Sequence, residues 1–367
     1  MKPLGAPLDP EDRAAFNDAF TRLLGDKSSE ADIRKTMETT GGYEPQLWQQ
    51  LAEIGILGLI VDPEFGGSGA SAIELGEVME AAGAALLCAP LFASSVLAAS
   101  LLHYSDDSDA QQRLLPGIAD GSNIVTVAMT GSKGLWTQDA VNVTANGNSL
   151  SGSASYVSYG HIANTLLVVA NTSNGIGLFE VGTNAEGLTI SPQQAFDLSQ
   201  RFAKCDFNNT PASPIKGDWS TVEAMLDVGR VALASQQAGG GAHLFDMTID
   251  YIKERYQFGR AVGSFQALKH MSADLLLEKE SAISAARHAA TSLATGSDDC
   301  QEAICLASFA CKDSYSKIAF DAIQMHGGIG FTWEYPAHLY VRRARADAQF
   351  LGSPAYYRER YIQAMGA

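Results

Sequence analysis

One stretch in the second half of the chain combines residue types that suit a nucleotide cofactor. Residues 254–266 place two arginines, two phenylalanines and a glutamine close together, at Arg255, Arg260, Phe258, Phe265 and Gln266. A guanidinium binds phosphate or carboxylate through two parallel hydrogen bonds, and an aromatic ring beside it can pack on a flat heterocycle. The alternative is a plain helical hairpin whose phenylalanines enter the core and whose arginines are solvated.

A second stretch, residues 324–331, offers a backbone that a ligand can approach closely. Gln324 supplies an amide, and Gly327 and Gly328 expose adjacent N–H groups without side-chain obstruction. It is not a dinucleotide-binding glycine motif, because no strand pattern precedes it. The alternative is a simple helix terminator with Gly327 as the C-cap.

Both stretches interrupt long helical patterns. Apolar residues recur at helical spacing in five C-terminal segments: 221–254, 264–295, 299–326, 336–351 and 354–364. Long antiparallel helices with short connections predict a four-helix bundle. Residues 11–119 are also mostly helical in pattern.

Between these helical regions the periodicity changes. Short β-rich runs fill residues 123–216, and turn signals such as Asn146-Gly147-Asn148 separate them. The sequence therefore predicts an α+β protein with an N-terminal helical domain (1–122), a middle β-barrel or sandwich (123–218) and a C-terminal helical bundle (219–367). This order is not the alternating pattern of a Rossmann fold.

Composition narrows the function classes. A net charge of −16 argues against nucleic acid and anionic membranes as partners. The five cysteines form no CxxC pair, so we expect neither a disulfide framework nor a metal site, and we expect a cytoplasmic location. No apolar run reaches the roughly 18 residues that a membrane span needs.

Other candidates for chemistry have structural interpretations that we favour. The glycine-rich run 66–69 could cradle a phosphate, but it lacks the lysine of a P-loop and is typical of a tight turn. His243, His270 and His326 are interpreted as packing or capping histidines rather than catalysts.

Together, the two C-terminal stretches resemble the paired signatures of the acyl-CoA dehydrogenase family. The Leu51–Leu59 helix that leads into the 66–69 turn also resembles that family's N-terminal region, so the similarity covers nearly the whole chain. The resemblance implies a FAD enzyme that dehydrogenates acyl-CoA thioesters and passes electrons to an electron-transfer flavoprotein. It also implies that both signatures reach across a dimer interface to the neighbour's FAD.

The resemblance assigns roles to individual residues. Arg255 would contact the pyrophosphate, Phe258 would pack on the cofactor and Gln266 would bond its polar edge. Gln324, with the backbone of Gly327 and Gly328, would hold the adenosine end.

The flavin-facing part of the middle domain departs from the family pattern. The loop at residues 129–134 lacks the acidic residue and the proline that are usual there, and looks shortened. Tyr156 stands where the family has tryptophan, while Ser158 keeps a hydroxyl that would face the flavin ring.

The catalytic base is missing from both of its family locations. One location is the segment 349–354, which contains no carboxylate, and the other is occupied by Gly229. Asp227 lies about 200° round the helix from that position and is expected to point away. We therefore assign no catalytic residue to this chain.

These departures predict a division of labour. The chain is interpreted as the base-lacking subunit of a heterotetramer with a homologous acyl-CoA dehydrogenase chain, acting on a bulky, steroid-like acyl-CoA. Small residues in 81–100 and 234–242 are expected to leave room for such a group. The alternatives are a self-sufficient homotetrameric dehydrogenase with an unrecognised base, and a structural paralogue without cofactor.

Overall fold

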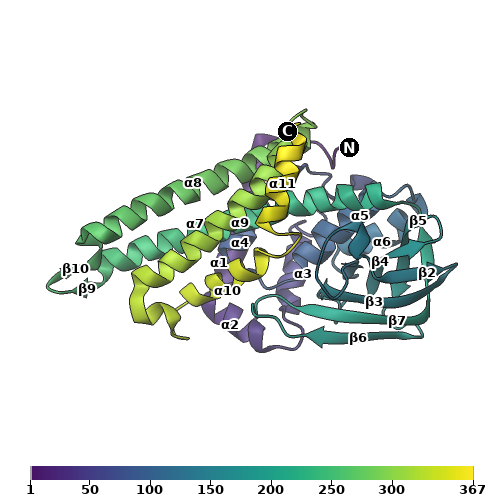
Figure 1. Ribbon diagram of the computed structural model, residues 1–367, viewed down its shortest axis with the longest axis horizontal. Helices are drawn as coiled ribbons and strands as arrows, with labels where there is room; N and C mark the ends of the chain where they lie inside the picture. The colour runs from purple at the N-terminus through teal and green to yellow at the C-terminus, as the bar shows by residue number, and fades with distance from the viewer. Residues whose placement is uncertain (1, 367) are drawn as a thin grey trace.

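The computed structural model of the chain describes residues 2–366. Helices form the first and last parts of the chain, and the strands between them in sequence form a sheet that lies at one end of the molecule (Figure 1). The α+β order predicted from the sequence is confirmed. The N-terminal helices are α1 (Pro10–Lys27), α2 (Glu30–Glu38), α3 (Pro45–Glu53), α4 (Ala72–Ala84), the π-helix η2 (Phe92–Ala98), α5 (Ala99–Tyr104) and α6 (Ser108–Ala119). Among residues 2–366, no helix is both long and apolar enough to cross a membrane.

The middle part forms one mixed sheet. Its strands are β1 (Val125–Ala128), β2 (Val143–Asn146), β3 (Ser149–Ser158), β4 (Thr165–Thr172), β5 (Gly175–Gly182), β6 (Leu188–Gln193), β7 (Phe202–Pro211) and β8 (Ser213–Ile215). The order is β6-β7-β3-β2-β4-β5-β8, and β1 pairs with β4 in parallel. The β2–β3 hairpin turns at Gly147, which has a φ of 58°. Glycine adopts this positive φ at little energetic cost because it has no Cβ, so the turn predicted from Asn-Gly is confirmed.

The C-terminal part is built on three long helices: α7 (Trp219–Glu254), α8 (Gln266–Thr295) and α9 (Cys300–His326). Two shorter helices, α10 (Ala337–Asp347) and α11 (Pro354–Ala364), cross them. With 36 residues, α7 is about 54 Å long at a rise of about 1.5 Å per residue. Figure 1 shows it running from the sheet to the opposite end of the molecule.

Glycines bring α4 and α7 into backbone contact. A Cβ added at Gly83 would lie 1.9 Å from the Gln236 carbonyl oxygen, and one at Gly239 would lie 1.9 Å from the Glu80 carbonyl oxygen. Real Cβ atoms cannot approach so closely, so these small residues serve tight packing. At Gly83 and Gly239, therefore, the neighbouring helix takes up the room that small residues were expected to leave.

We predict that Gly239→Ala destabilises the fold by about 1–3 kcal/mol, because the added methyl must push two helix backbones apart. Gly25→Ala is the matched control, since Gly25 lies in α1 with nothing within 4 Å of an added Cβ. That substitution should stabilise by about 0.5–1 kcal/mol. Denaturant unfolding measures both, and equal effects of the two substitutions would contradict the close packing of α4 and α7.

Candidate functional site

The residues around Phe258 form a tight hairpin at the end of α7. Strands β9 (Tyr256–Gln257) and β10 (Arg260–Ala261) pair antiparallel, with Gln257 opposite Arg260. The two turn residues have positive φ, 55° at Phe258 and 76° at Gly259, as a two-residue hairpin turn requires. Phe258 is 89% exposed, so the alternative in which it plugs the core is wrong.

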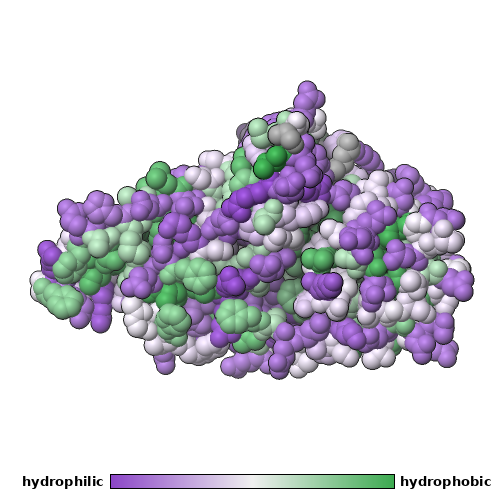
Figure 2. All heavy atoms as spheres, viewed as in Figure 1, coloured by the Kyte–Doolittle hydropathy of each residue, from purple (hydrophilic) through white to green (hydrophobic). Residues whose placement is uncertain are grey.

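The hairpin presents a cation, an aromatic face and an amide on one exposed tip. The Arg260 guanidinium lies 3.9 Å from the centre of the Phe265 ring, and the Phe258 and Phe265 rings meet edge-on at 6.1 Å. Arg255 and Gln266 are exposed on either side. Figure 2 shows apolar atoms gathered at this end of the molecule, next to polar ones.

The diglycine turn follows α9 directly. Gly327 has a φ of 65° and caps the helix, so its role as a terminator is confirmed. An added Cβ at Gly327 or Gly328 would meet nothing within 4 Å, so the backbone there is also open to a ligand. Gln324 is exposed on the last turn of α9.

The structure brings the two stretches to the same end of the bundle. Tyr251, one turn before the hairpin, donates from its hydroxyl to the His326 carbonyl oxygen at 3.2 Å, and the two rings stack at 4.4 Å. Burial lowers the pKa of His326, and its Nδ1 donates to the Ala322 carbonyl oxygen. His326 thus packs and orients the turn, as the sequence indicates.

Ser158 lies far from that group. It ends β3 and lines a small cavity of about 40 Å³ with Phe92 and Phe350. From Gly229, which packs beside this region, α7 continues about 38 Å before it reaches the hairpin. The predicted cofactor residues therefore lie at two separate places on the chain. A single ligand could contact Ser158 and the hairpin together only if the two came from different chains.

A second, larger cavity of about 800 Å³ opens between the sheet and the segment that joins α10 to α11. Aromatic side chains line it at Trp136, Tyr156, Phe202 and Phe350, and it is also lined by the cations Lys133 and Arg345. Within residues 2–366, no aspartate or glutamate lines this cavity or the smaller one. Sequence reasoning identified Tyr156 but missed Trp136, whose loop departs from the family pattern.

The two expected locations of a catalytic base lie against each other. A Cβ added at Gly229 would lie 3.1 Å from Cδ1 of Leu351 and 2.7 Å from Cδ2 of Leu97. Leu351 is 1% exposed, so hydrocarbon fills the space that a base would need. A general base must reach within hydrogen-bond distance of the proton that it removes.

Asp227, the nearest carboxylate in sequence, is engaged elsewhere. It is 1% exposed, accepts from Nη1 of Arg230 at 2.5 Å and accepts from Nε2 of Gln301 at 2.6 Å. It lines a different surface groove, beside Tyr104 and Trp219. Its side chain therefore points away from Leu351, as the helical geometry predicts.

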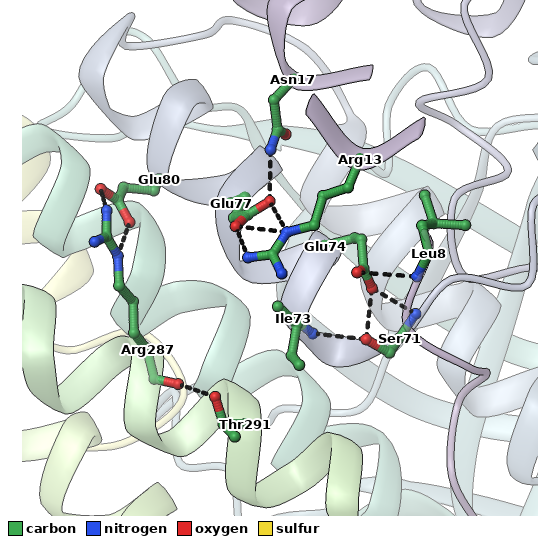
Figure 3. Close-up of polar contacts among 10 residues, drawn as sticks. All are labelled: Leu8, Arg13, Asn17, Ser71, Ile73, Glu74, Glu77, Glu80, Arg287 and Thr291. Carbon is green, nitrogen blue, oxygen red and sulfur yellow. Dashed lines mark hydrogen bonds and ion pairs between the residues drawn. The ribbon is translucent and has the colours of Figure 1, made fainter. Parts of the chain in front are cut away.

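The carboxylates of α4 are occupied in the same way (Figure 3). Glu74 accepts from the Ser71 hydroxyl at 2.5 Å, and Glu80 accepts from Nη2 of Arg287 at 2.8 Å. Glu77 accepts from Nε of Arg13 at 2.9 Å, and although burial acts in the other direction, this bond lowers its pKa. These three residues tie α4 to its neighbours and line neither cavity.

The glycine-rich turn at 66–69 is a structural turn. A Cβ added at Gly67 would lie 2.1 Å from the Val61 carbonyl oxygen, and Gly66 has a φ of 86°. The favoured interpretation of this run therefore agrees with the backbone.

Comparison with known proteins gives a consistent result. The models "Acyl-CoA dehydrogenase, N-terminal domain" and "Acyl-CoA dehydrogenase, C-terminal domain" match residues 10–122 and 217–366. Acyl-CoA dehydrogenase IpdE2 of Mycolicibacterium smegmatis is 30% identical over 348 residues, which cover 94% of this chain and 96% of that protein.

Solved structures are similar over their whole length. A variant of the Tcur3481-Tcur3483 steroid ACAD has a TM-score of 0.87 at 26% identity and covers 97% of this chain and 98% of its own. The ChsE4-ChsE5 complex from Mycobacterium tuberculosis has a TM-score of 0.89 at 23% identity, with 98% of each chain covered, and shares the fold.

We predict that Arg230→Met destabilises the chain by about 3–5 kcal/mol, because it leaves the Asp227 carboxylate buried without its cation. Lys204→Met is the matched control, since the Lys204–Asp206 pair is 43% exposed on both sides and is expected to contribute about 1 kcal/mol or less. Denaturant unfolding of both variants checks this. A similar small effect for both would show that Asp227 is not fixed by Arg230.

Proposed function

Since the chain belongs to the acyl-CoA dehydrogenase family, we propose that it is the base-lacking subunit of a heterotetramer that dehydrogenates a bulky, steroid-like acyl-CoA. The resemblance seen in the sequence is confirmed by the family match and by IpdE2. The chain is thus an acyl-CoA dehydrogenase, an oxidoreductase, and its cofactor is FAD. Its specific task inside an assembly is the proposal.

One observation supports the proposal most directly. Gly229 occupies one expected base location, and Leu351, within the segment 349–354 that is the other, packs beside it, with a Cβ–Cδ1 separation of 3.1 Å if a Cβ is added at Gly229. Loss of a general base typically lowers the rate by about a hundredfold to ten-thousandfold. A homologous partner chain that keeps the carboxylate would supply the proton acceptor.

The exposed hairpin and turn fit the cofactor. The Arg255 guanidinium would form paired bonds to the pyrophosphate, Phe258 would pack on the cofactor, and the Gln266 amide would bond its polar edge. Gln324 and the open N–H groups of Gly327 and Gly328 would hold the adenosine end. Bound FAD supplies the acceptor for the hydride that leaves the β-carbon of the acyl group.

The residues of the hairpin and of the diglycine turn are proposed to contact the FAD of a neighbouring chain. They lie at the far end of α7, about 38 Å along the helix from Gly229, so they cannot close the cavity of their own chain. For a flavin ring in that cavity, Tyr156 would line the wall. Ser158 remains the candidate hydroxyl for the ring.

The size of the smaller cavity supports an acyl group that is bound mainly by the partner. The space between α4, α7 and β3 measures about 40 Å³, whereas sites for drug-sized ligands are on the order of 300–1,000 Å³. The glycine contacts of α4 and α7 close it further. A steroid-like group therefore binds in the other subunit, and this chain completes the cofactor site.

The relatives support the assembly and the substrate class. The Tcur3481-Tcur3483 protein, at 26% identity, is named a steroid ACAD, and its double name is consistent with an assembly of two different chains. The family's usual electron acceptor, an electron-transfer flavoprotein, is the proposed redox partner here.

Co-expression tests the proposal. The chain alone should bind little FAD and should not reduce a ferricenium acceptor with acyl-CoA. Together with a homologous subunit that keeps the carboxylate, it should form a complex of two copies of each chain, yellow and active. A flavin-saturated, fully active homo-oligomer of this chain alone would refute the proposal, and a colourless complex would point to a structural paralogue.

We predict that Arg255→Gln weakens FAD binding by that complex about 10- to 100-fold, because a charge-assisted pair of hydrogen bonds to phosphate is lost. Lys253→Gln is the matched control, since Lys253 is exposed on the last turn of α7, two residues from Arg255. Flavin titration by fluorescence quenching measures both. Equal affinities for the two variants would remove Arg255 from the cofactor site.

A further inference from the structure

A buried lysine holds the backbone segment where the family location of the base lies. Lys312, on α9, is 2% exposed. Its Nζ donates to three carbonyl oxygens, those of Asp347 at 3.2 Å, Phe350 at 2.5 Å and Gly352 at 2.8 Å. An ammonium group has three donors, so all of them are used on this one segment.

A tyrosine completes the arrangement. The Tyr357 hydroxyl donates to the Leu351 carbonyl oxygen, the one that Lys312 leaves open between Phe350 and Gly352. Nε of Arg230 in turn donates to the Tyr357 oxygen at 3.1 Å, which orients the hydroxyl. We name Lys312 and Tyr357 together the carbonyl clamp.

The clamped segment needs support because its backbone is unusual. Leu351 has a φ of 58°, in the left-handed region that costs a non-glycine residue about 1 kcal/mol or more, and Gly352 has a φ of 113°. Such a backbone conformation persists only where several surrounding contacts hold it in place. The clamp provides three of those constraints on consecutive carbonyls.

The position of the segment determines the floor of the large cavity. Phe350 contacts the Trp136 ring at 5.1 Å, Phe92 at 5.5 Å and Phe202 at 5.9 Å between centroids. Leu351, next in sequence, covers Gly229.

We propose that Lys312 is a positioning residue whose ammonium, with the Tyr357 hydroxyl, fixes Phe350–Gly352 as the floor of the 800 Å³ cavity. Its consequence for the flavin rests on the function proposed above. The position of Phe350–Gly352 does not depend on that function and can be measured in this chain.

The charge of Lys312 makes the clamp sensitive to pH. Burial lowers the pKa of Lys312 to about 7, while the Asp347 carboxyl raises it, the Arg230 guanidinium lowers it and the Cys311 thiol raises it. Tyr357, from α11, presents its ring to Nζ at 5.6 Å. Above pH 7 the neutral amine keeps two donors for three carbonyls, so the clamp weakens.

The contribution of Lys312 to the free energy of unfolding changes with pH in the opposite direction. Between pH 7 and 10.5 the unfolded chain still holds the proton of Lys312 and the folded chain does not, so this group adds stability as pH rises. Below pH 7 both states are protonated and its contribution is constant. A role in stability alone and a role in positioning therefore give pH profiles of opposite sign.

The test compares Lys312→Met with Lys317→Met, which lies five residues further along α9 with its side chain 47% exposed. The readouts are Trp136 emission, taken as the difference from Trp136→Phe, and hydrogen exchange of residues 350–353. In the unmodified full chain, Trp136 emission should titrate with a midpoint near pH 7. Lys312→Met should abolish that titration and speed exchange about tenfold or more, while Lys317→Met should do neither.

Three outcomes would overturn the proposal. Lys312→Met with unchanged emission and exchange is the first. A titration that survives in Lys312→Met but disappears in Asp347→Asn is the second, since the pKa of Asp347 is raised to about 6 by burial. If Lys312→Met does not fold, Tyr357→Phe takes its place, and unchanged exchange at residues 351–352 would be the third.

Discussion

The backbone contact between α4 and α7 is the constraint on which the rest of the structure depends. It exists because Gly83 and Gly239 present no Cβ at the crossing, where carbonyl oxygens come within 1.9 Å of where one would be. It fixes a helix of about 54 Å in one place, with the sheet at its start and the hairpin at its end. The cavity and the two candidate cofactor stretches are therefore held apart by the length of this helix, which is why the proposal above assigns them to different cofactor sites.

The same contact explains why little space remains between α4, α7 and β3. Small residues on a helix can either leave a void or let a neighbour approach, and protein interiors, which are close-packed, favour approach. Between α4 and α7 the neighbour has approached, and about 40 Å³ remains. The hydrocarbon beside Gly229 is a separate contact, made by Leu97 and Leu351, and both packing features are consistent with the subunit role proposed above.

The sequence predicts local features well and distant contacts poorly. The ends of α7, α8 and α9 agree with the periodicity to within two residues, since caps and glycines mark them. The hairpin at Gly147 follows from its turn signal. The helix expected at 336–351 ends instead at Asp347, because carbonyls of residues 347–352 bond to Lys312 and Tyr357, which no local pattern reveals. Trp136 and the closed acyl space also depend on residues more than a hundred positions apart.

Packing makes a carboxylate difficult to accommodate beside Gly229 in this chain. A carboxylate at position 351 would replace a leucine that is 1% exposed and lies beside Gly229. Burying an unpaired carboxylate raises its pKa and costs several kcal/mol. The three donors of Lys312 already bond to backbone carbonyls of that segment, so none is left to donate to such a carboxylate. A carboxylate would therefore fit at position 351 only if the carbonyl clamp and the hydrocarbon around Gly229 changed together.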